Sequence, residues 1–455
     1  MSTFRRKREY GEEQPYIPAG IFKIRLPFFH WKWSWPEGIQ SFILVAVALA
    51  AVPFIQTALD TSFEVAVLMV LIANGIYMLH PTFGDPVFPG WITAGIPLVL
   101  AHLSAYESGP ERVHALIALQ MLVALLFIVL GATGLAKKIV TSIPISMRGG
   151  VLLGAAFAAI FGIIGPESIH FQGREISGSI GIVTCLIVLY SLWFTKLQNR
   201  STLLRLISKI GMLASMIIAM VIGLAVGELP MPVIEWGITP LPFRELITNY
   251  TIFGLGFPRF GFFLAAAPLA FLLYLIAFGE VVVSETIMKD ADASREDEKV
   301  DYSVNRANII IGARNAILSF VAPFPPLAGP IWVGGTVSTV ERFKHGRASM
   351  DSIYDGMSTF ILGIAAAILV LPLITLLAPA FPIGMIITMT LTGFACSYVA
   401  MNMLKTREDQ GIAVIMGVTI FARGAAFGLI TGLILHLAIN LVITPWHRSK
   451  SKENP

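Results

Sequence analysis

Two stretches, PVFPGWITAGIP at residues 86–97 and PFPPLAGPIWVGGT at residues 323–336, decide the fold. Prolines remove backbone donors and glycines loosen the chain, so each stretch is predicted to be an extended segment followed by a half-helix. Irregular backbone at membrane depth is tolerated only where protein or a water-filled cavity covers it. A matched pair of breaks therefore indicates a central substrate site in a transporter. The alternative is a pair of kinked or re-entrant structural helices.

The composition of the rest of the chain is typical of a polytopic helical membrane protein. Of 455 residues, 56% are hydrophobic and 13% are charged, against about 45 to 50% and about 25% in soluble domains. Long continuous apolar runs do not fit a β-barrel. Cys185 and Cys396 lie in apolar segments, so they predict neither a disulfide framework nor a metal pair. Because no nucleotide-binding loop, catalytic set or metal-ligand motif occurs, we expect no enzyme activity and no cofactor, and we expect no nucleic-acid partner.

Fourteen apolar spans are predicted, in two groups of seven. Residues 36–227 hold the first group and residues 260–445 the second, with an extracytoplasmic proline-rich linker at 228–259. An interfacial N-terminal segment (1–35) and a tail (446–455) flank them. The spans are predicted near 38–59, 62–80, 86–104, 113–135, 145–164, 176–195, 205–227, 260–288, 303–322, 327–343, 354–378, 382–404, 410–422 and 425–445.

The basic residues predict the orientation. With these spans, 27 of the 32 Lys and Arg residues lie on the side that holds both termini. Retained basic residues mark the cytoplasmic face, so both termini are predicted to be cytoplasmic. We expect a multi-pass protein of a plasma membrane, the inner membrane in a bacterium.

A weak repeat relates the two groups. Pro-Ile-Ser-Met at 144–147 recurs as Pro-Ile-Gly-Met at 382–385, an offset of 238, and Trp91 recurs as Trp332, an offset of 241. Gln40 lies 240 residues before Glu280. Because seven spans are an odd number, two such repeats have opposite membrane orientations, which is the inverted-repeat plan of many secondary transporters.

Glu280 is the most informative charged residue, since it lies about 20 residues into the eighth span, where a bare carboxylate costs several kcal/mol. We expect it to bind substrate, or to take up a proton or cation whose movement is coupled to transport. Ser284 is four residues later on the same helical face and Glu285 is not. The alternative is that both glutamates mark the cytoplasmic end of the helix, near Lys289 and Asp290.

The entrances of the two half-helices supply the other candidate site residues. Trp91 and Trp332 are placed to stack on a planar ligand between the repeats, or else they are interfacial anchors. Arg314, in the ninth span, is predicted to be structural or snorkelling. The predicted substrate-binding set contains Glu280, Gln40, Trp91, Ile92, Thr93, Trp332, Val333, Gly334, Gly335 and Thr336, with Glu280 and Ser284 for ion or proton coupling.

Several short motifs, taken in order, resemble the nucleobase–ascorbate transporter family, which contains the bacterial uracil and xanthine permeases. The resemblance begins near residue 36 and covers nearly the whole chain. It implies fourteen segments in two inverted repeats, a core and a gate domain, and a homodimer. It also implies short strands in the third and tenth segments, whose following helices face the substrate. The motifs are Gly38-Ile39-Gln40, Ile143-Pro144 with Gly149-Gly150, Glu280, and the run Arg306, Gly312, Asn315 and Pro325-Pro326.

Two departures from that family leave the substrate open. Ser41 stands where members usually have His, and Trp332, Val333 and Gly334 stand where they have an acid or amide. The leading hypothesis is symport of a small planar or anionic solute, with a nucleobase-like compound as the best guess, driven by a proton or sodium gradient. The alternative is a sulfate- or bicarbonate-type anion transporter or channel of the same fold. A membrane enzyme lacks any recognisable catalytic set.

Overall fold

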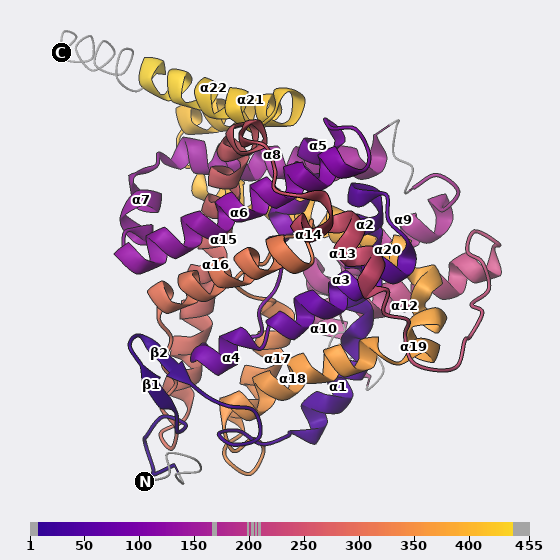
Figure 1. Cartoon of the computed structure of the whole chain (residues 1–455), viewed down its shortest axis with the longest axis vertical. Coiled ribbons are helices and arrows are strands. Elements are labelled where there is room, and N and C mark those ends of the chain that lie inside the picture. The colour runs from indigo at the N-terminus through magenta and orange to yellow at the C-terminus, as the bar shows by residue number, and fades with distance from the viewer. Residues whose placement is uncertain are drawn as a thin grey trace.

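The computed structural model describes residues 8–165, 171–197, 200–201, 204, 207 and 211–439. The predicted tail at 446–455 and the start of the seventh predicted span lie outside these residues. Helices dominate the described chain, and a short antiparallel hairpin, β1 (Ile17–Ala19) with β2 (Phe22–Ile24), lies near the N-terminus (Figure 1).

Helices occupy the predicted apolar spans with shifts of a few residues at their ends. The first half contains α1 (Trp35–Leu49), α2 (Ala51–Leu59), α3 (Phe63–Ile76), α4 (Leu79–Phe83), η1 (Thr93–Gly95), α5 (Ile96–Ser104), α6 (Pro110–Thr133), α7 (Ala136–Ser142), α8 (Ile145–Ile164), α9 (Glu175–Tyr190), α10 (Leu192–Leu197) and α12 (Met212–Ala225). The second half contains α13 (Phe243–Tyr250), α14 (Ile252–Leu255), α15 (Phe260–Ser294), α16 (Val304–Val321), α17 (Val333–Lys344), α18 (Ile353–Ile368), α19 (Leu371–Leu377), η3 (Ala378–Ala380), α20 (Phe381–Met403), α21 (Arg407–Arg423) and α22 (Ala425–Leu437).

Local sequence signals set several helix ends. Helix α6 has Pro110 in its first turn and stops at Gly134, whose φ is 69°, because proline suits the first turn and glycine the left-handed position after the last. Helix α18 begins with a capping box in which Ser352 and Asp355 satisfy each other's backbone amides. These signals fix where α6 and α18 begin or end.

Six helical stretches in the described chain are long and apolar enough to cross a membrane, by length and composition. They are Trp35–Leu59, Phe63–Phe83, Pro110–Thr133, Ile145–Ile164, Phe260–Ser294 and Leu371–Met403. The predicted all-α polytopic class is confirmed. The number of fourteen spans stays a prediction, and the proline-rich linker contains α13 and α14, which the sequence did not predict.

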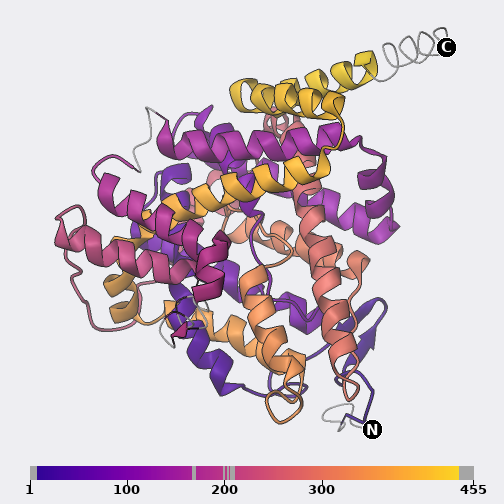
Figure 2. The same ribbon diagram turned by 180° about the vertical axis from the view of Figure 1, so that it is seen from behind.

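The helices pair across the two halves of the chain. Helices α15 and α16 of the second half pack on α6 of the first half. In the same arrangement, α1 and α3 of the first half pack on α18 of the second half. Helices α20 and α21 both lie against α8, so late and early segments are interleaved (Figure 2). These matched pairs are what two structurally related halves produce.

The N-terminal segment folds back onto the loops that follow α15 and α17 and onto the first turn of α18. The Lys23 ammonium lies 2.7 Å from an Asp301 carboxylate oxygen, and the Arg25 guanidinium stacks 3.9 Å from the centre of the Tyr354 ring. The backbone amide of Lys32 donates to Asp355 at 2.7 Å. We call residues 8–34 the N-terminal strap, because they tie these loops together.

A buried acid lies where the strap meets the loops. Glu298 is 1% exposed, its carboxylate lies 2.8 Å from the Arg8 guanidinium, and it accepts a hydrogen bond from the Ser352 hydroxyl at 2.7 Å. Burial raises the pKa of Glu298 from its ordinary value of 4.5 to about 7, although Arg8 opposes the shift. The neutral acid is therefore the form that folding favours.

Replacing Glu298 by Gln should flatten the pH dependence of stability. Since the folded pKa lies above the unfolded one, the contribution of Glu298 is complete below pH 4.5 and is lost as the pH rises through about 7, a loss of at most about 3 kcal/mol. Thermal unfolding in detergent from acid to neutral pH should show a falling midpoint in the wild type and a flatter one in Glu298→Gln. Glu296→Gln, an exposed neighbour, should behave like the wild type. Equal slopes in all three proteins would contradict the assignment.

Candidate substrate site

The two interrupted stretches meet as antiparallel extended segments. The Gly329 amide donates to the Gly90 carbonyl at 2.9 Å, and the Trp332 amide donates to the Phe88 carbonyl at 2.8 Å. Trp91 pairs with Ala328 as an isolated antiparallel bridge. The predicted extended segments before the half-helices are confirmed, and we call this pairing of residues 88–92 with residues 326–332 the crossing.

Glycine is required where the two backbones approach. A Cβ on Gly90 would lie 2.5 Å from the Ile331 carbonyl oxygen, and a Cβ on Gly329 would overlap the backbone of Trp91. Neither position tolerates any other residue without displacing backbone atoms.

Helix α16 holds the crossing by side-chain hydrogen bonds. The Asn315 amide group donates to the Ala328 carbonyl at 2.9 Å and accepts from the Ala328 amide at 2.9 Å. Arg314 donates to the Gly329 carbonyl at 2.7 Å and to the Gly90 carbonyl at 3.2 Å. Both side chains are fully buried. Arg314 is thus structural, as one of the two predicted readings had it, and it does not snorkel.

Each extended segment leads into a half-helix. The first continues through η1 into α5, and the second continues into α17, which begins at Val333. No side chain in the described chain caps α17, so the amides of Val333, Gly334 and Gly335 open the helix. Uncapped amides and the positive end of the helix dipole attract a negative group.

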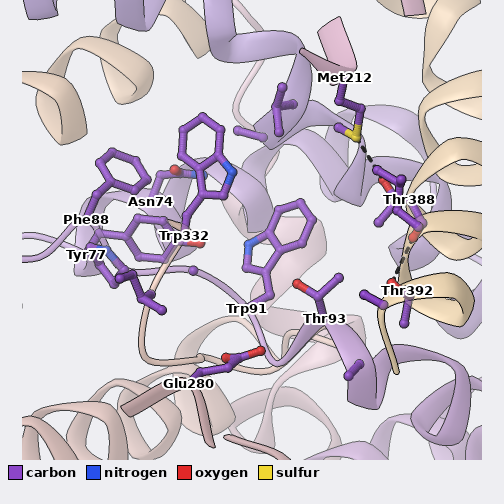
Figure 3. A pocket seen from close by; sticks show the side chains of 18 of the residues that line it. Asn74, Tyr77, Phe88, Trp91, Thr93, Met212, Glu280, Trp332, Thr388 and Thr392 are labelled. Atoms are coloured by element: carbon purple, nitrogen blue, oxygen red, sulfur yellow. Dashed lines mark hydrogen bonds between the residues drawn. The ribbon is translucent and has the colours of Figure 1, made fainter. Parts of the chain in front are cut away.

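A cavity of about 330 Å³ lies against the crossing. Aromatic rings and short polar side chains surround it, with Trp91 and Trp332 near the centre and Met212, Thr388 and Thr392 opposite (Figure 3). Among the residues that line it, Glu280 is the charged one and none is basic. The lining comprises Val47, Ala48, Asn74, Tyr77, Phe88, Pro89, Gly90, Trp91, Thr93, Ala94, Tyr190, Met212, Glu280, Ile331, Trp332, Ile364, Thr388, Leu391, Thr392, Ala395 and Cys396.

Glu280, on α15, points its carboxyl group toward this cavity (Figure 3). The side chain is half-buried, and its Oε2 atom is buried with no hydrogen-bond partner among the described residues. Ser284 donates to the main-chain carbonyl of Glu280 at 2.9 Å, not to the carboxylate. Glu285 instead forms an ion pair with Lys289 at 2.7 Å. A buried oxygen without a hydrogen-bond partner can bind a proton, a cation or a donor group of a ligand.

The structure brings only part of the predicted site together. Trp91, Thr93, Trp332 and Glu280 line the cavity, and the other predicted residues do not. Thr336 is held by the Phe88 backbone, to which its hydroxyl donates at 3.2 Å.

The remaining predicted side chains have other roles or positions. Gln40 donates to Ser338 at 2.8 Å, and Ile92 and Gly335 are buried within the crossing region. Val333 and Gly334 are exposed at the start of α17, directly after Trp332, and do not line the cavity. Ser284 is buried on α15, so its contact is with the helix backbone and not with the cavity.

The sequence-based prediction missed several lining residues. Thr388 and Thr392 are one helical turn apart in an apolar helix, and that i, i+4 polar pair was a detectable signal. Asn74, in the apolar helix α3, was another. Tyr77 and Met212 gave no local signal, because only the tertiary packing brings them to the cavity.

Several solved structures are similar to this chain. The transmembrane domain of a cyanobacterium bicarbonate transporter, BicA, is 14% identical, with a TM-score of 0.47, covering 87% of this chain and 95% of that one. Murine Solute Carrier 26 family member A9, an anion transporter in the inward-facing state, is 13% identical, with a TM-score of 0.54, covering 92% and 70%. Another SLC26A9 structure is 16% identical, with a TM-score of 0.48, covering 90% and 67%.

The chain has the fold of the murine transporter. No family model matches the sequence, and no curated protein sequence matches it. The murine structure therefore confirms the expected fold, and no comparison confirms the nucleobase–ascorbate family.

Replacing Asn315 by Leu should destabilise the protein more than a typical surface change. The variant leaves both the amide and the carbonyl of Ala328 buried without a partner, at a cost of about 2 to 5 kcal/mol. Thermal unfolding in detergent should show a clearly lower midpoint for Asn315→Leu. Asn305→Leu, an exposed position on the same helix, should change the midpoint little. Equal midpoints for the two variants would show that the crossing does not depend on Asn315.

Proposed function

We propose that this chain is a secondary transporter of a small inorganic anion, such as bicarbonate, which it binds at the crossing and moves together with a proton or a cation held at Glu280. The observation that carries the proposal is the cavity that places the unpartnered Glu280 carboxylate beside the start of an uncapped half-helix. The descriptions of the similar structures as bicarbonate and anion transporters support the same substrate class.

The half-helices supply the recognition of the anion. No Lys or Arg lines the cavity in the described chain, so the positive potential there comes from backbone amides and helix dipoles. Trp332, the residue that precedes α17, lines the cavity, and the amides of Val333, Gly334 and Gly335 follow it directly. Amides at the start of a helix bind a small oxyanion without any basic side chain.

Glu280 makes coupling to a second ion necessary. A charged carboxylate in the same cavity repels an anion, and the repulsion is strong where water is scarce. A proton or a sodium ion on Glu280 removes it. The anion then binds well only when Glu280 is neutralised, which is the thermodynamic basis of symport.

A nucleobase-like solute is the second candidate, and the aromatic lining favours it. Trp91, Trp332, Tyr77 and Phe88 all border the cavity, and rings of this kind stack on planar solutes. However, Trp332 already packs edge to face with Phe88, with centroids 5.2 Å apart. A thermal-shift panel of bicarbonate, sulfate, carboxylates, purines and pyrimidines separates the two candidates, because a ligand that binds the folded state raises its unfolding temperature.

We also propose a homodimer in a plasma membrane, the inner membrane in a bacterium, with both termini in the cytoplasm. The asymmetry of Lys and Arg between the predicted loops supports this orientation. The N-terminal strap, which packs on the loop after α15 and on the first turn of α18, belongs to the same basic side.

Replacing Glu280 by Gln should uncouple transport without removing the anion site. Gln mimics the neutral acid but takes up no proton and holds a cation poorly, so gradient-driven accumulation of bicarbonate in proteoliposomes should fall at least about tenfold. Exchange of labelled bicarbonate at equal concentrations on both sides should persist. Glu285→Gln is the matched control, because it removes a nearby carboxylate of α15 that is already paired with Lys289. This variant should accumulate bicarbonate like the wild type. Unchanged accumulation in Glu280→Gln would exclude this role for Glu280.

A further inference from the structure

A second, larger cavity adjoins the first. It measures about 790 Å³ and lies between α15 and the start of α16 on one side and α7, α8 and α20 on the other. Glu280, Ala94, Ala395 and Cys396 line both cavities. The second cavity therefore begins where the central one ends, and we call it the outer chamber.

Two basic side chains line the outer chamber, Lys137 on α7 and Arg148 in the first turn of α8. Arg148 is half-buried, and its Nε atom is buried with no hydrogen-bond partner in the part of the chain that the structure describes. Nothing in that part forms an ion pair with Arg148 or Lys137. Of the two acids in the chamber, Glu285 is already paired with Lys289 at 2.7 Å, and Glu280 lies at the inner end, where it also faces the central cavity.

An unpaired, half-buried guanidinium is stabilised when it binds an anion. Withdrawing a charged group from water costs free energy unless a partner of opposite sign replaces the lost hydration. A guanidinium presents its donors in a planar fork that matches two oxygens of a carboxylate or other oxyanion. Lys137 adds a second, mobile positive charge from a different helix.

We propose that Arg148 and Lys137 form a second anion site, which receives a small oxyanion between the central cavity and the side of the membrane that carries the basic loops. The proposal rests on the transport function proposed above and gives the transported anion a second binding site. The site lies on α7 and α8, whereas Glu280 lies on α15 across the chamber, so an anion passes from a half-helix site to a side-chain site. The phosphate of an anionic lipid has the same chemistry and is the competing occupant.

The site is tested by chemical protection of Arg148. Purified protein, freed of lipid in a neutral detergent, is treated with phenylglyoxal, which modifies arginine, and the modified peptides are quantified by mass spectrometry. Sodium sulfate is the probe, at an ionic strength matched with sodium gluconate. Sulfate should slow the modification of Arg148 several-fold and leave Arg423, on the far end of α21, unchanged.

Matched lysine variants locate the site. Lys137→Gln should weaken the protection of Arg148 by sulfate, because it removes one of the two charges. Lys138→Gln removes the neighbouring lysine, which is exposed and does not line the outer chamber, and should protect like the wild type. Identical protection in both variants, or no protection of Arg148 by sulfate in the wild type, would overturn the proposal.

Two further arms separate the possible sources and the two proposals. Protection by phosphatidylglycerol but not by sulfate would assign the site to a lipid phosphate and overturn the role in transport. In proteoliposomes that transport bicarbonate, Arg148→Gln should raise the half-saturating concentration by about tenfold or more from the basic side, with the value from the opposite side unchanged. Protection of Arg148 is measured on the residue itself, so a wild type that binds sulfate there but transports no anion would refute the transport function and not the site.

Discussion

The architecture depends on how the backbone is satisfied where two interrupted segments cross inside an apolar fold. Backbone amides and carbonyls at that depth have no water to bind, so each needs a partner within the protein. The two segments bond to each other through Gly90 and Gly329. Helix α16 completes the set, since Asn315 bonds to both polar groups of Ala328 and Arg314 bonds to the carbonyls of Gly90 and Gly329. Extended backbone can exist here only because these side chains are in place.

The positions of the functional groups follow from the crossing. Because the segments are fixed, the half-helices that follow them start at fixed points, and Trp91 and Trp332 are held against one cavity that Glu280 also lines. Side-chain hydrogen bonds also hold the backbone that leads into the crossing. Arg306 on α16 bonds to the Asp85 carboxylate at 2.9 Å, and the Tyr354 hydroxyl donates to the Gly84 carbonyl at 2.8 Å. These bonds anchor the chain just before the first extended segment, so strap, loops and crossing form one connected network.

Much of this fold was predictable from local sequence, and the reasons are physical. Prolines and glycines at 86–97 and 323–336 report directly on a backbone that cannot be a continuous helix, and Glu280 stands out because a carboxylate is costly in an apolar span. The ion pair between Lys23 of the N-terminal hairpin and Asp301 was not predictable, since it joins residues that are far apart in the chain. The predicted tenth span began six residues before α17 does, because its first residues belong to the extended segment. Site residues such as Tyr77 and Met212 carry no local signal of their own, because only the tertiary packing brings these apolar and aromatic side chains to the cavity.

The central claim is that the crossing and Glu280 together form the place where a small anion binds. Anomalous diffraction from crystals of the protein soaked in selenate, an oxyanion that selenium makes directly visible, tests this claim most directly. We predict a selenium peak in the cavity beside Trp91 and the first turn of α17, at low pH or with sodium present. A cavity that stays empty under these conditions while selenate binds elsewhere, or a continuous helix in place of residues 86–97, would contradict the account.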